Sequence, residues 1–291
     1  MQVQQNYLLK SDNTFGIAAL AKYFATFSSA EELKELLNNY KHISSKMILG
    51  GGSNVLFTRD YNGLVLKNEI PGIKMLNEDK EYIYINAGAG VKWHHLVMYS
   101  IKNNYAGMEN LSLIPGNAGA SPMQNIGAYG VEVKDIFYEL EALHLEDSRI
   151  EKFKAGDCEF DYRDSIFKRR LKGKFAILSV TYRLKKNPVF NISYGALKKE
   201  LERMNIRELS IKAISDAVIH IRTSKLPNPD VIGNAGSFFK NPVVDQNELN
   251  EIEKIADNIP YHASGDSNYK IPAGWLIEQC GWKGYRKGDA G

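Results

Sequence analysis

Residues 47–57 read MILGGGSNVLF, a short apolar run that passes directly into a cluster of glycine, serine and asparagine. The apolar run predicts a buried β-strand, and the cluster predicts a loop at its end. Backbone amides in such a loop can form a concave anion site, where glycines avoid side chains that would block close approach or forbid positive φ. The spacing matches neither the dinucleotide-binding fingerprint nor a P-loop. This stretch alone therefore leaves two interpretations open, a pyrophosphate site and a flexible hairpin loop.

A second glycine-rich segment, residues 107–130, is long, apolar and poor in charged side chains. A loop of this size in a compact domain is commonly functional or disordered, and the apolar residues argue against disorder. Its small side chains and backbone amides would suit a flat ring system with polar edges. The alternative is a purely structural Ω-loop.

Strands and helices are predicted on both sides of these loops. Ser29 and Glu32 form an S-x-x-E pattern, which predicts a helix start ahead of three regularly spaced leucines. A change of composition at residues 185–188 predicts a linker. We therefore expect an α+β protein with domains at residues 1–187 and 188–291, in which short strands alternate with helices through the first two-thirds. Hydrophobic patterning places further strands at residues 64–66, 82–85 and 177–184, and helices at residues 93–102, 194–204, 210–224 and from about 245.

The charge distribution does not favour nucleic-acid binding. The formal net charge is +3, from 37 basic and 34 acidic residues that are mixed along the chain. Cys158 and Cys280, the two cysteines, lack the spacing of a zinc site or a disulfide framework, so no metal is expected. No apolar stretch has the length of a membrane span, and the N-terminus does not resemble a secretory signal. We expect a cytoplasmic monomer without membrane insertion.

Six motifs resemble those of the UDP-N-acetylenolpyruvoylglucosamine reductase (MurB) family and occur in the same order. One such motif would be weak evidence, but six in order across nearly the whole chain are highly specific. They are NTFG (residues 13–16), LGGGSNVLF (49–57), IPGNAGASPMQNIGAYG (114–130), YRDS (162–165), GNAGSFFKNP (233–242) and AGWLI (273–277).

The resemblance implies a two-part FAD-binding domain of the vanillyl-alcohol oxidase (PCMH) type, followed by a substrate-binding domain. It also implies noncovalent FAD and a two-step reaction. NADPH reduces the flavin, and the reduced flavin then reduces the enolpyruvyl group of UDP-N-acetylglucosamine enolpyruvate. The product would be UDP-N-acetylmuramic acid, a peptidoglycan precursor for the cell wall.

Both glycine loops match the family's flavin-binding motifs. The resemblance therefore implies cofactor contacts from Gly50, Gly51, Gly52, Ser53, Asn54, Val55, Pro115, Gly116, Ser121, Asn125, Gly127, Ala128, Tyr129 and Gly130.

Two residues match the family's catalytic positions. Ser237 matches the serine that protonates the substrate carbon, although by itself a serine in such a segment more often satisfies a local amide. Arg163 matches the catalytic arginine, whose planar fork can hold a carboxylate and stabilise enolate-like charge. Without the resemblance, a surface pair of Arg163 with Asp161 or Asp164 would be the ordinary interpretation.

Tyr194, Lys225 and Asn241 match positions that the family uses against the substrate's diphosphate. A phenol, a point cation and an amide suit that group. Lys225 by itself could equally be a helix C-terminal cation. Tyr194 belongs to a loop of the longer, lid-bearing type I branch, in which we place the sequence.

The family's third catalytic residue is a glutamate beyond the AGWLI motif. The sequence ends at Gly291, where the strand before that acid should begin, so we expect this glutamate and the last helix to be lacking; Glu278 is not its counterpart. Two alternatives remain open. One is another PCMH-type flavoenzyme, an alcohol oxidase with a flavin tethered through His94 or His95. The other is an inactive module that binds FAD and a nucleotide sugar.

Overall fold

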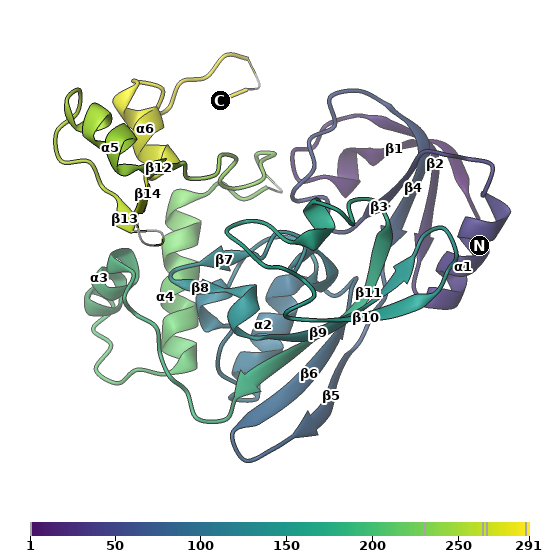
Figure 1. Cartoon of the computed structure of the whole chain (residues 1–291), viewed down its shortest axis with the longest axis horizontal. Coiled ribbons are helices and arrows are strands. Elements are labelled where there is room, and N and C mark those ends of the chain that lie inside the picture. Colours follow the sequence, from purple (N-terminus) through teal and green to yellow (C-terminus); the bar gives the residue numbers. More distant parts are fainter. Residues whose placement is uncertain (1, 230, 264, 266, 289) are drawn as a thin grey trace. The chain divides into compact units, whose positions relative to one another are not determined.

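The computed structural model describes residues 2–229, 231–263, 265, 267–288 and 290–291. The chain forms two compact units, Met1–Gly236 and Ser237–Gly291, which run from purple to green and from green to yellow in Figure 1. The expected domain boundary at residues 187 and 188 stays a prediction.

The first sheet of the larger unit contains, in spatial order, β1 (Gln4–Leu8), β2 (Leu20–Phe27), β4 (Tyr61–Asn68) and β3 (Lys46–Leu49). β1 is antiparallel to β2, whereas β2 and β3 both run parallel to β4. Helix α1 (Ala30–Asn39) connects β2 to β3 and buries three leucines against the sheet. Ser29 caps the helix as expected, but the Glu32 carboxylate accepts the N–H of Ser28 and not that of Ser29.

The parallel pairing of β3 with β4 determines the path of the first glycine loop. Parallel neighbours cannot be joined by a tight hairpin, because the chain must return to the opposite end of the sheet. Residues 50–60 make that return. The hairpin interpretation of the loop is therefore wrong, and residues 50–55 lie where the carboxyl end of β3 leaves the sheet.

The second sheet is antiparallel and contains, in spatial order, β10 (Ile150–Lys154), β9 (Phe137–His144), β11 (Phe175–Lys185), β6 (Tyr82–Gly88) and β5 (Ile73–Glu78). Helix α2 (Trp93–Lys102) follows β6, with the bounds that the hydrophobic pattern predicts. Among the described residues, α1 and α2 are the only α-helices before residue 194, so the expected alternation of strands with helices is too regular.

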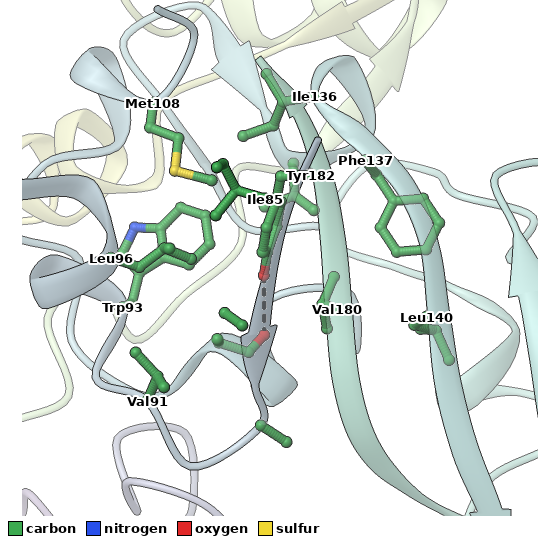
Figure 2. Packing of buried hydrophobic residues seen from close by; sticks show 14 of the residues in the cluster. Ile85, Val91, Trp93, Leu96, Met108, Ile136, Phe137, Leu140, Val180 and Tyr182 are labelled. Carbon is green, nitrogen blue, oxygen red and sulfur yellow. Dashed lines mark hydrogen bonds between the residues drawn. The ribbon is translucent and has the colours of Figure 1, made fainter. Parts of the chain in front are cut away.

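The core of this region joins α2 to the second sheet. Trp93 and Tyr182 are fully buried and meet edge to face with ring centroids 5.6 Å apart (Figure 2). Trp93 Nε1 donates to the Leu111 carbonyl oxygen at 2.8 Å, and the Tyr182 hydroxyl donates to the Ala118 carbonyl oxygen at 3.2 Å. Both bonds run from rigid core rings into the second glycine segment, which is thereby attached to the sheet.

The second glycine segment contains short regular pieces. These are the 3₁₀ turns η2 (Glu109–Leu111) and η3 (Ala118–Ala120) and the two-residue strand β7 (Gly127–Ala128), which pairs with β8 (Val131–Glu132). Helices α3 (Gly195–Arg203) and α4 (Ile211–Lys225) complete the unit and share a small apolar cluster. A short connection joins them as a helical hairpin, so the start of α3 and the end of α4 lie at the same end of that hairpin.

The smaller unit has a sheet of β12 (Val243–Asp245), β14 (Asn268–Lys270) and β13 (His262–Ala263). Helix α5 (Gln246–Glu253) begins with a reciprocal capping box between Asp245 and Glu248, as the pattern predicts. Helix α6 (Ala273–Gln279) carries the AGWLI motif.

Candidate active site

The first glycine loop packs against residues 12–14. Gly52 has a φ of +65°, in the left-handed region that glycine adopts without strain. Its carbonyl oxygen accepts the N–H of Thr14 at 3.2 Å. A Cβ on Gly52 would lie 2.0 Å from the Asp12 carbonyl oxygen, so the approach of the two segments requires glycine here.

The two glycine loops also meet each other. A Cβ on Gly51 would lie 2.9 Å from Asn117 Oδ1. A Cβ on Gly116, whose φ is +106°, would lie 2.7 Å from Ser53 Oγ. Asn54 Nδ2 donates to Gln124 Oε1 at 3.0 Å. The loops therefore form one structure, although they are far apart in the sequence.

A third segment joins the same place. The N–H of Asn234 donates to the Thr14 carbonyl oxygen at 2.8 Å. A Cβ on Gly233 would lie 2.1 Å from the Phe15 carbonyl oxygen. The NTFG motif, both glycine loops and the start of the GNAGSFFKNP motif thus converge within the larger unit.

This junction leaves hydrogen-bonding groups available. The backbone N–H groups of Gly51, Gly52 and Ser53 donate to none of the residues that the structure describes. Thr14 Oγ1 is buried and has no hydrogen-bond partner among the described residues. Buried polar groups in folded proteins nearly always have a partner. Amide donors beside glycines suit an anion, so these residues fit the pyrophosphate of a dinucleotide cofactor.

In the second loop, Ser121 and Asn125 are buried and their side chains bond to protein. Ser121 Oγ lies 2.8 Å from the Tyr182 hydroxyl oxygen. Asn125 Nδ2 donates to Glu132 Oε2 at 2.9 Å, and Asn125 Oδ1 accepts the N–H of Lys134. These side chains hold the shape of the loop, which leaves its backbone to contact a ligand.

The other expected cofactor residues lie along the two loops. Gly50 directly follows β3, and Val55 packs against the apolar cluster beside the first sheet. Pro115 is exposed next to Gly116, whereas Gly127 and Ala128 form β7. Tyr129 and Gly130 both have positive φ, and they turn the chain between β7 and β8.

Arg163 belongs to the same region. Its Nη2 donates to the Gly127 carbonyl oxygen at 2.5 Å, and its Nη1 donates to that of Asn125 at 3.5 Å. Its φ is +53°, which is rare for a residue with a side chain. Among the described residues its guanidinium pairs with no carboxylate, so the surface-pair interpretation is wrong.

Three further side chains extend this cationic region. Tyr129 and Tyr194 meet edge to face with ring centroids 5.4 Å apart. Arg222 Nε donates to the Leu113 carbonyl oxygen at 3.2 Å, and the Arg222 guanidinium lies near the Tyr129 side chain. Burial lowers the pKa of Arg222, and the nearby charge of Arg163 acts in the same direction. Two guanidinium groups therefore lie beside the second loop, and neither has a carboxylate partner among the described residues.

Lys225 is the last residue of α4, three positions after Arg222, and its side chain is exposed. Tyr194 is the N-cap residue of α3 and is 43% exposed. Tyr194 and Lys225 therefore lie at the same end of the hairpin that α3 and α4 form.

Ser237 and Asn241 lie in the smaller unit. Ser237 is exposed in an irregular segment beside Phe238 and Phe239. Asn241 Oδ1 accepts the N–H of Ala273, the first residue of α6. The side-chain amide of Asn241 thus ties the GNAGSFFKNP motif to the AGWLI motif.

Comparison with known proteins identifies the family. Residues 21–154 match the FAD binding domain, and residues 227–291 match the UDP-N-acetylenolpyruvoylglucosamine reductase C-terminal domain. The UDP-N-acetylenolpyruvoylglucosamine reductase of Amoebophilus asiaticus is 54% identical over 292 residues, which cover 100% of this chain and 86% of that protein. The enzyme of the same name from Flavobacterium johnsoniae is 47% identical over the same shares of the two chains. This chain belongs to the UDP-N-acetylenolpyruvoylglucosamine reductase family.

The fold agrees with that of a solved MurB structure. The crystal structure of the Thermus caldophilus enzyme aligns with a TM-score of 0.66 and 24% identity, and it covers 99% of this chain and 83% of that one. The expected α+β fold with a two-part FAD-binding domain is confirmed. A member of the MurB family is an FAD-dependent oxidoreductase, so the alcohol oxidase does not describe this chain, whereas the inactive module stays an alternative.

His94, which the oxidase alternative would use as a flavin tether, has a different contact. It lies on α2, and its Nδ1 accepts the N–H of Leu113 at 3.0 Å. Burial lowers the pKa of His94, and the positive charge of Arg222 lowers it further. A neutral imidazole therefore supports the second loop.

Sequence reasoning missed several residues of this MurB site. Thr14 lies inside a motif that was recognised, but its hydroxyl was not singled out. Arg222 precedes Lys225 by three positions on one helix, and that spacing could have marked it as a neighbour. The ion pair of Lys67 Nζ with the buried Asp12 carboxylate, at 2.7 Å, had no local signal because its partners are distant in sequence.

None of the helices among the described residues is long and apolar enough to cross a membrane. No group of three or more histidine, cysteine, aspartate or glutamate side chains among those residues could hold a metal ion.

Proposed function

We propose that this protein uses NADPH and noncovalently bound FAD to reduce the enolpyruvyl group of UDP-N-acetylglucosamine enolpyruvate. The product is UDP-N-acetylmuramic acid for peptidoglycan synthesis. Membership in the MurB family supports the reaction. The observation that carries the site is the convergence of Thr14, Gly52, Gly116 and Asn234.

When bound, FAD would supply the chemistry of hydride transfer between NADPH and the enolpyruvyl double bond. The amides of Gly51, Gly52 and Ser53 and the hydroxyl of Thr14 would hold its pyrophosphate, because they need acceptors and lie where glycines leave room. The backbone of the second loop, from Pro115 to Gly130, would border the flavin ring.

Arg163 would bind the enolpyruvyl carboxylate and stabilise the negative charge that develops as the double bond is reduced. Its guanidinium is held by two carbonyl oxygens, so it is oriented before the substrate binds. Arg222 adds a second positive charge beside the same loop. A partly buried guanidinium without a carboxylate partner among the described residues is costly, and an anionic substrate would offset that cost.

Tyr194 and Lys225 would contact the diphosphate of the substrate. Both are exposed at one end of the α3 and α4 hairpin, where a phenol and an ammonium group can donate to phosphate oxygens. Asn241 would contact the same diphosphate through its side-chain amide. Ser237 would donate a proton to the enolpyruvyl carbon that does not receive the hydride.

Residues 1–187 would form the FAD-binding domain and residues 188–291 the substrate domain, with Tyr194 marking the lid-bearing type I branch. We place the protein in the cytoplasm, where NADPH and UDP-sugars occur, and we expect a monomer, which gel filtration would check.

Ser237→Ala tests the proton donor, because the two half-reactions differ in their need for a proton. Flavin reduction by NADPH needs none from serine and should keep its normal rate. Reoxidation by the enolpyruvyl substrate should slow at least about a hundredfold, the low end for a lost general acid. Ser237→Cys should recover part of that rate, since a thiol also donates a proton.

Ser267→Ala is a matched control, because Ser267 is another exposed serine of the smaller unit. It should leave both half-reactions unchanged in stopped-flow measurements. Equal slowing of both half-reactions by Ser237→Ala would mean that Ser237 supports the flavin site and donates no proton.

A further inference from the structure

The connection from β11 to α3, residues 186–194, carries Tyr194 and contains no helix or strand. A connection of this kind normally moves more than the elements that it joins. A tyrosine at its end needs an attachment if it is to meet a diphosphate in one fixed position. Two asparagine side chains supply such an attachment.

Asn110 bridges the second glycine loop and this connection. It lies in η2 and is 2% exposed. Its Nδ2 donates to the Tyr129 carbonyl oxygen at 2.9 Å and to the Asn191 carbonyl oxygen at 2.8 Å. Both hydrogens of the Asn110 amide are therefore used, one toward the second loop and one toward the connection.

Asn191 makes the return bond. Its Nδ2 donates to the Gly130 carbonyl oxygen at 2.9 Å. Its Oδ1 accepts the hydroxyl of Ser193 at 2.7 Å and the N–H of Ser193 at 3.2 Å, which fixes the turn before Tyr194. A Cβ on Gly130 would lie 3.1 Å from Asn191 Nδ2, so the absence of a side chain there lets the amide approach.

Apolar packing holds part of this connection, because Phe190 and Ile192 pack against the apolar cluster of α3 and α4. Asn110, Gly130 and Asn191 line a cavity of about 260 Å³. At Asn191 itself, between these two apolar residues, hydrogen bonds join the connection to η2 and to the second loop. Beyond them, the edge-to-face contact of Tyr129 with Tyr194 continues the same attachment to the second loop.

We infer that Asn110 and Asn191 form an asparagine clamp that positions Tyr194 against the substrate's diphosphate. The clamp joins the turn at Tyr129 and Gly130, on the flavin side of the site, to the tyrosine on the substrate side. Both asparagines are positioning residues that act through Tyr194. The inference rests on the proposed function, in which Tyr194 contacts the diphosphate.

UDP is the probe, because it carries the diphosphate without the reacting group. Its affinity is measured by calorimetry on the FAD-loaded protein. Asn191→Ala and Asn110→Ala should each weaken UDP binding about three- to tenfold, as expected when one or two hydrogen bonds that order a contact are lost. Flavin reduction by NADPH should stay within twofold of the parent rate, since the pairing of β7 with β8 still holds the turn at Tyr129 and Gly130.

Two further variants guard against general damage. Asn191→Asp keeps the acceptor for Ser193 and removes the donor to Gly130, so it should weaken UDP binding as Asn191→Ala does. Asn103→Ala is the control, because Asn103 is an exposed asparagine whose amide bonds the Tyr99 carbonyl oxygen at the end of α2. It should leave UDP affinity unchanged.

The decisive comparison is a double-mutant cycle with Tyr194→Ala. A clamp that acts through Tyr194 predicts that Asn191→Ala adds no further loss once the tyrosine is gone. Additive losses, or a loss with Tyr194→Ala but none with either clamp variant, would overturn the clamp. If Tyr194→Ala itself leaves UDP affinity unchanged, the proposed role of Tyr194 fails instead, and the clamp has no substrate contact to position.

Discussion

Alanine at Gly52 and alanine at Gly50 should damage two different properties of the protein. At Gly52 the added Cβ would lie 2.0 Å from the Asp12 carbonyl oxygen and 2.8 Å from Asn13 Cα, so backbone must move. At Gly50 the nearest protein atoms to an added Cβ are 4.0 Å away, which is ordinary contact. The first change should disturb the fold, and the second should disturb only what binds against the loop.

The magnitude at Gly52 follows from two costs. The left-handed conformation costs a residue with a side chain roughly 1–2 kcal/mol. Displacing packed backbone costs about 1–3 kcal/mol more. A total of about 2–5 kcal/mol corresponds to a melting temperature lower by roughly 4–20 °C for a unit of this size. At Gly50 the melting temperature should stay within about 2 °C of the parent value, while FAD affinity should fall about tenfold or more as the Cβ hinders the pyrophosphate.

The assay has two readouts, thermal unfolding of the FAD-free protein and FAD binding followed by flavin fluorescence. Gly156→Ala is a suitable control, because an added Cβ there meets no atom within 4 Å. A Gly52→Ala variant with the melting temperature of the parent protein would refute the close approach of the first loop to residue 12. A Gly50→Ala variant that binds FAD as tightly as the parent protein does would refute this loop as the pyrophosphate site.

Three further predictions concern other residues of the site. Thr14→Val removes a buried hydroxyl without a partner, so the FAD-free protein should melt no lower, while FAD should bind about tenfold or more weakly; unchanged FAD affinity would contradict the assignment. His94 has a lowered pKa, so its stabilising contribution is present above its ordinary pKa of about 6.5 and is lost as pH falls through the folded value. His94→Asn keeps an acceptor for Leu113 and should flatten the pH dependence of melting between about pH 7 and pH 5; a profile identical to the parent's would exclude this role. Arg163→Lys loses the planar fork and should slow substrate-dependent flavin reoxidation about a hundredfold with little effect on NADPH oxidation; equal effects on both steps in stopped flow would show a structural role.

Local patterns predicted the elements with strong hydrophobic periodicity. Helix α2 was located to the residue, because Trp93, Leu96, Val97 and Ile101 recur at helical spacing and are buried. Strand β1 was missed because its side chains, QQNYL, are polar and mostly exposed, as befits a strand at the edge of a sheet. Strand β5 lies at the other sheet's edge and likewise presents mostly exposed residues.

The geometry of the site depends on contacts between distant segments, which no local pattern reveals. The need for glycine at position 52 comes from the carbonyl group of Asp12. The orientation of Arg163 comes from carbonyl oxygens more than thirty positions away. The motif resemblance predicted that these residues belong to the site, and the fold shows which contacts hold them together within the larger unit.

An anaerobic titration tests the central claim most directly. The purified protein, loaded with FAD, is bleached with one equivalent of NADPH, and UDP-N-acetylglucosamine enolpyruvate is then added while flavin absorbance is followed. We predict that NADPH bleaches the flavin and that the enolpyruvyl substrate restores its colour with equal amounts of UDP-N-acetylmuramic acid formed. A flavin that stays bleached after addition of the substrate, with no product detected, would contradict the proposed function.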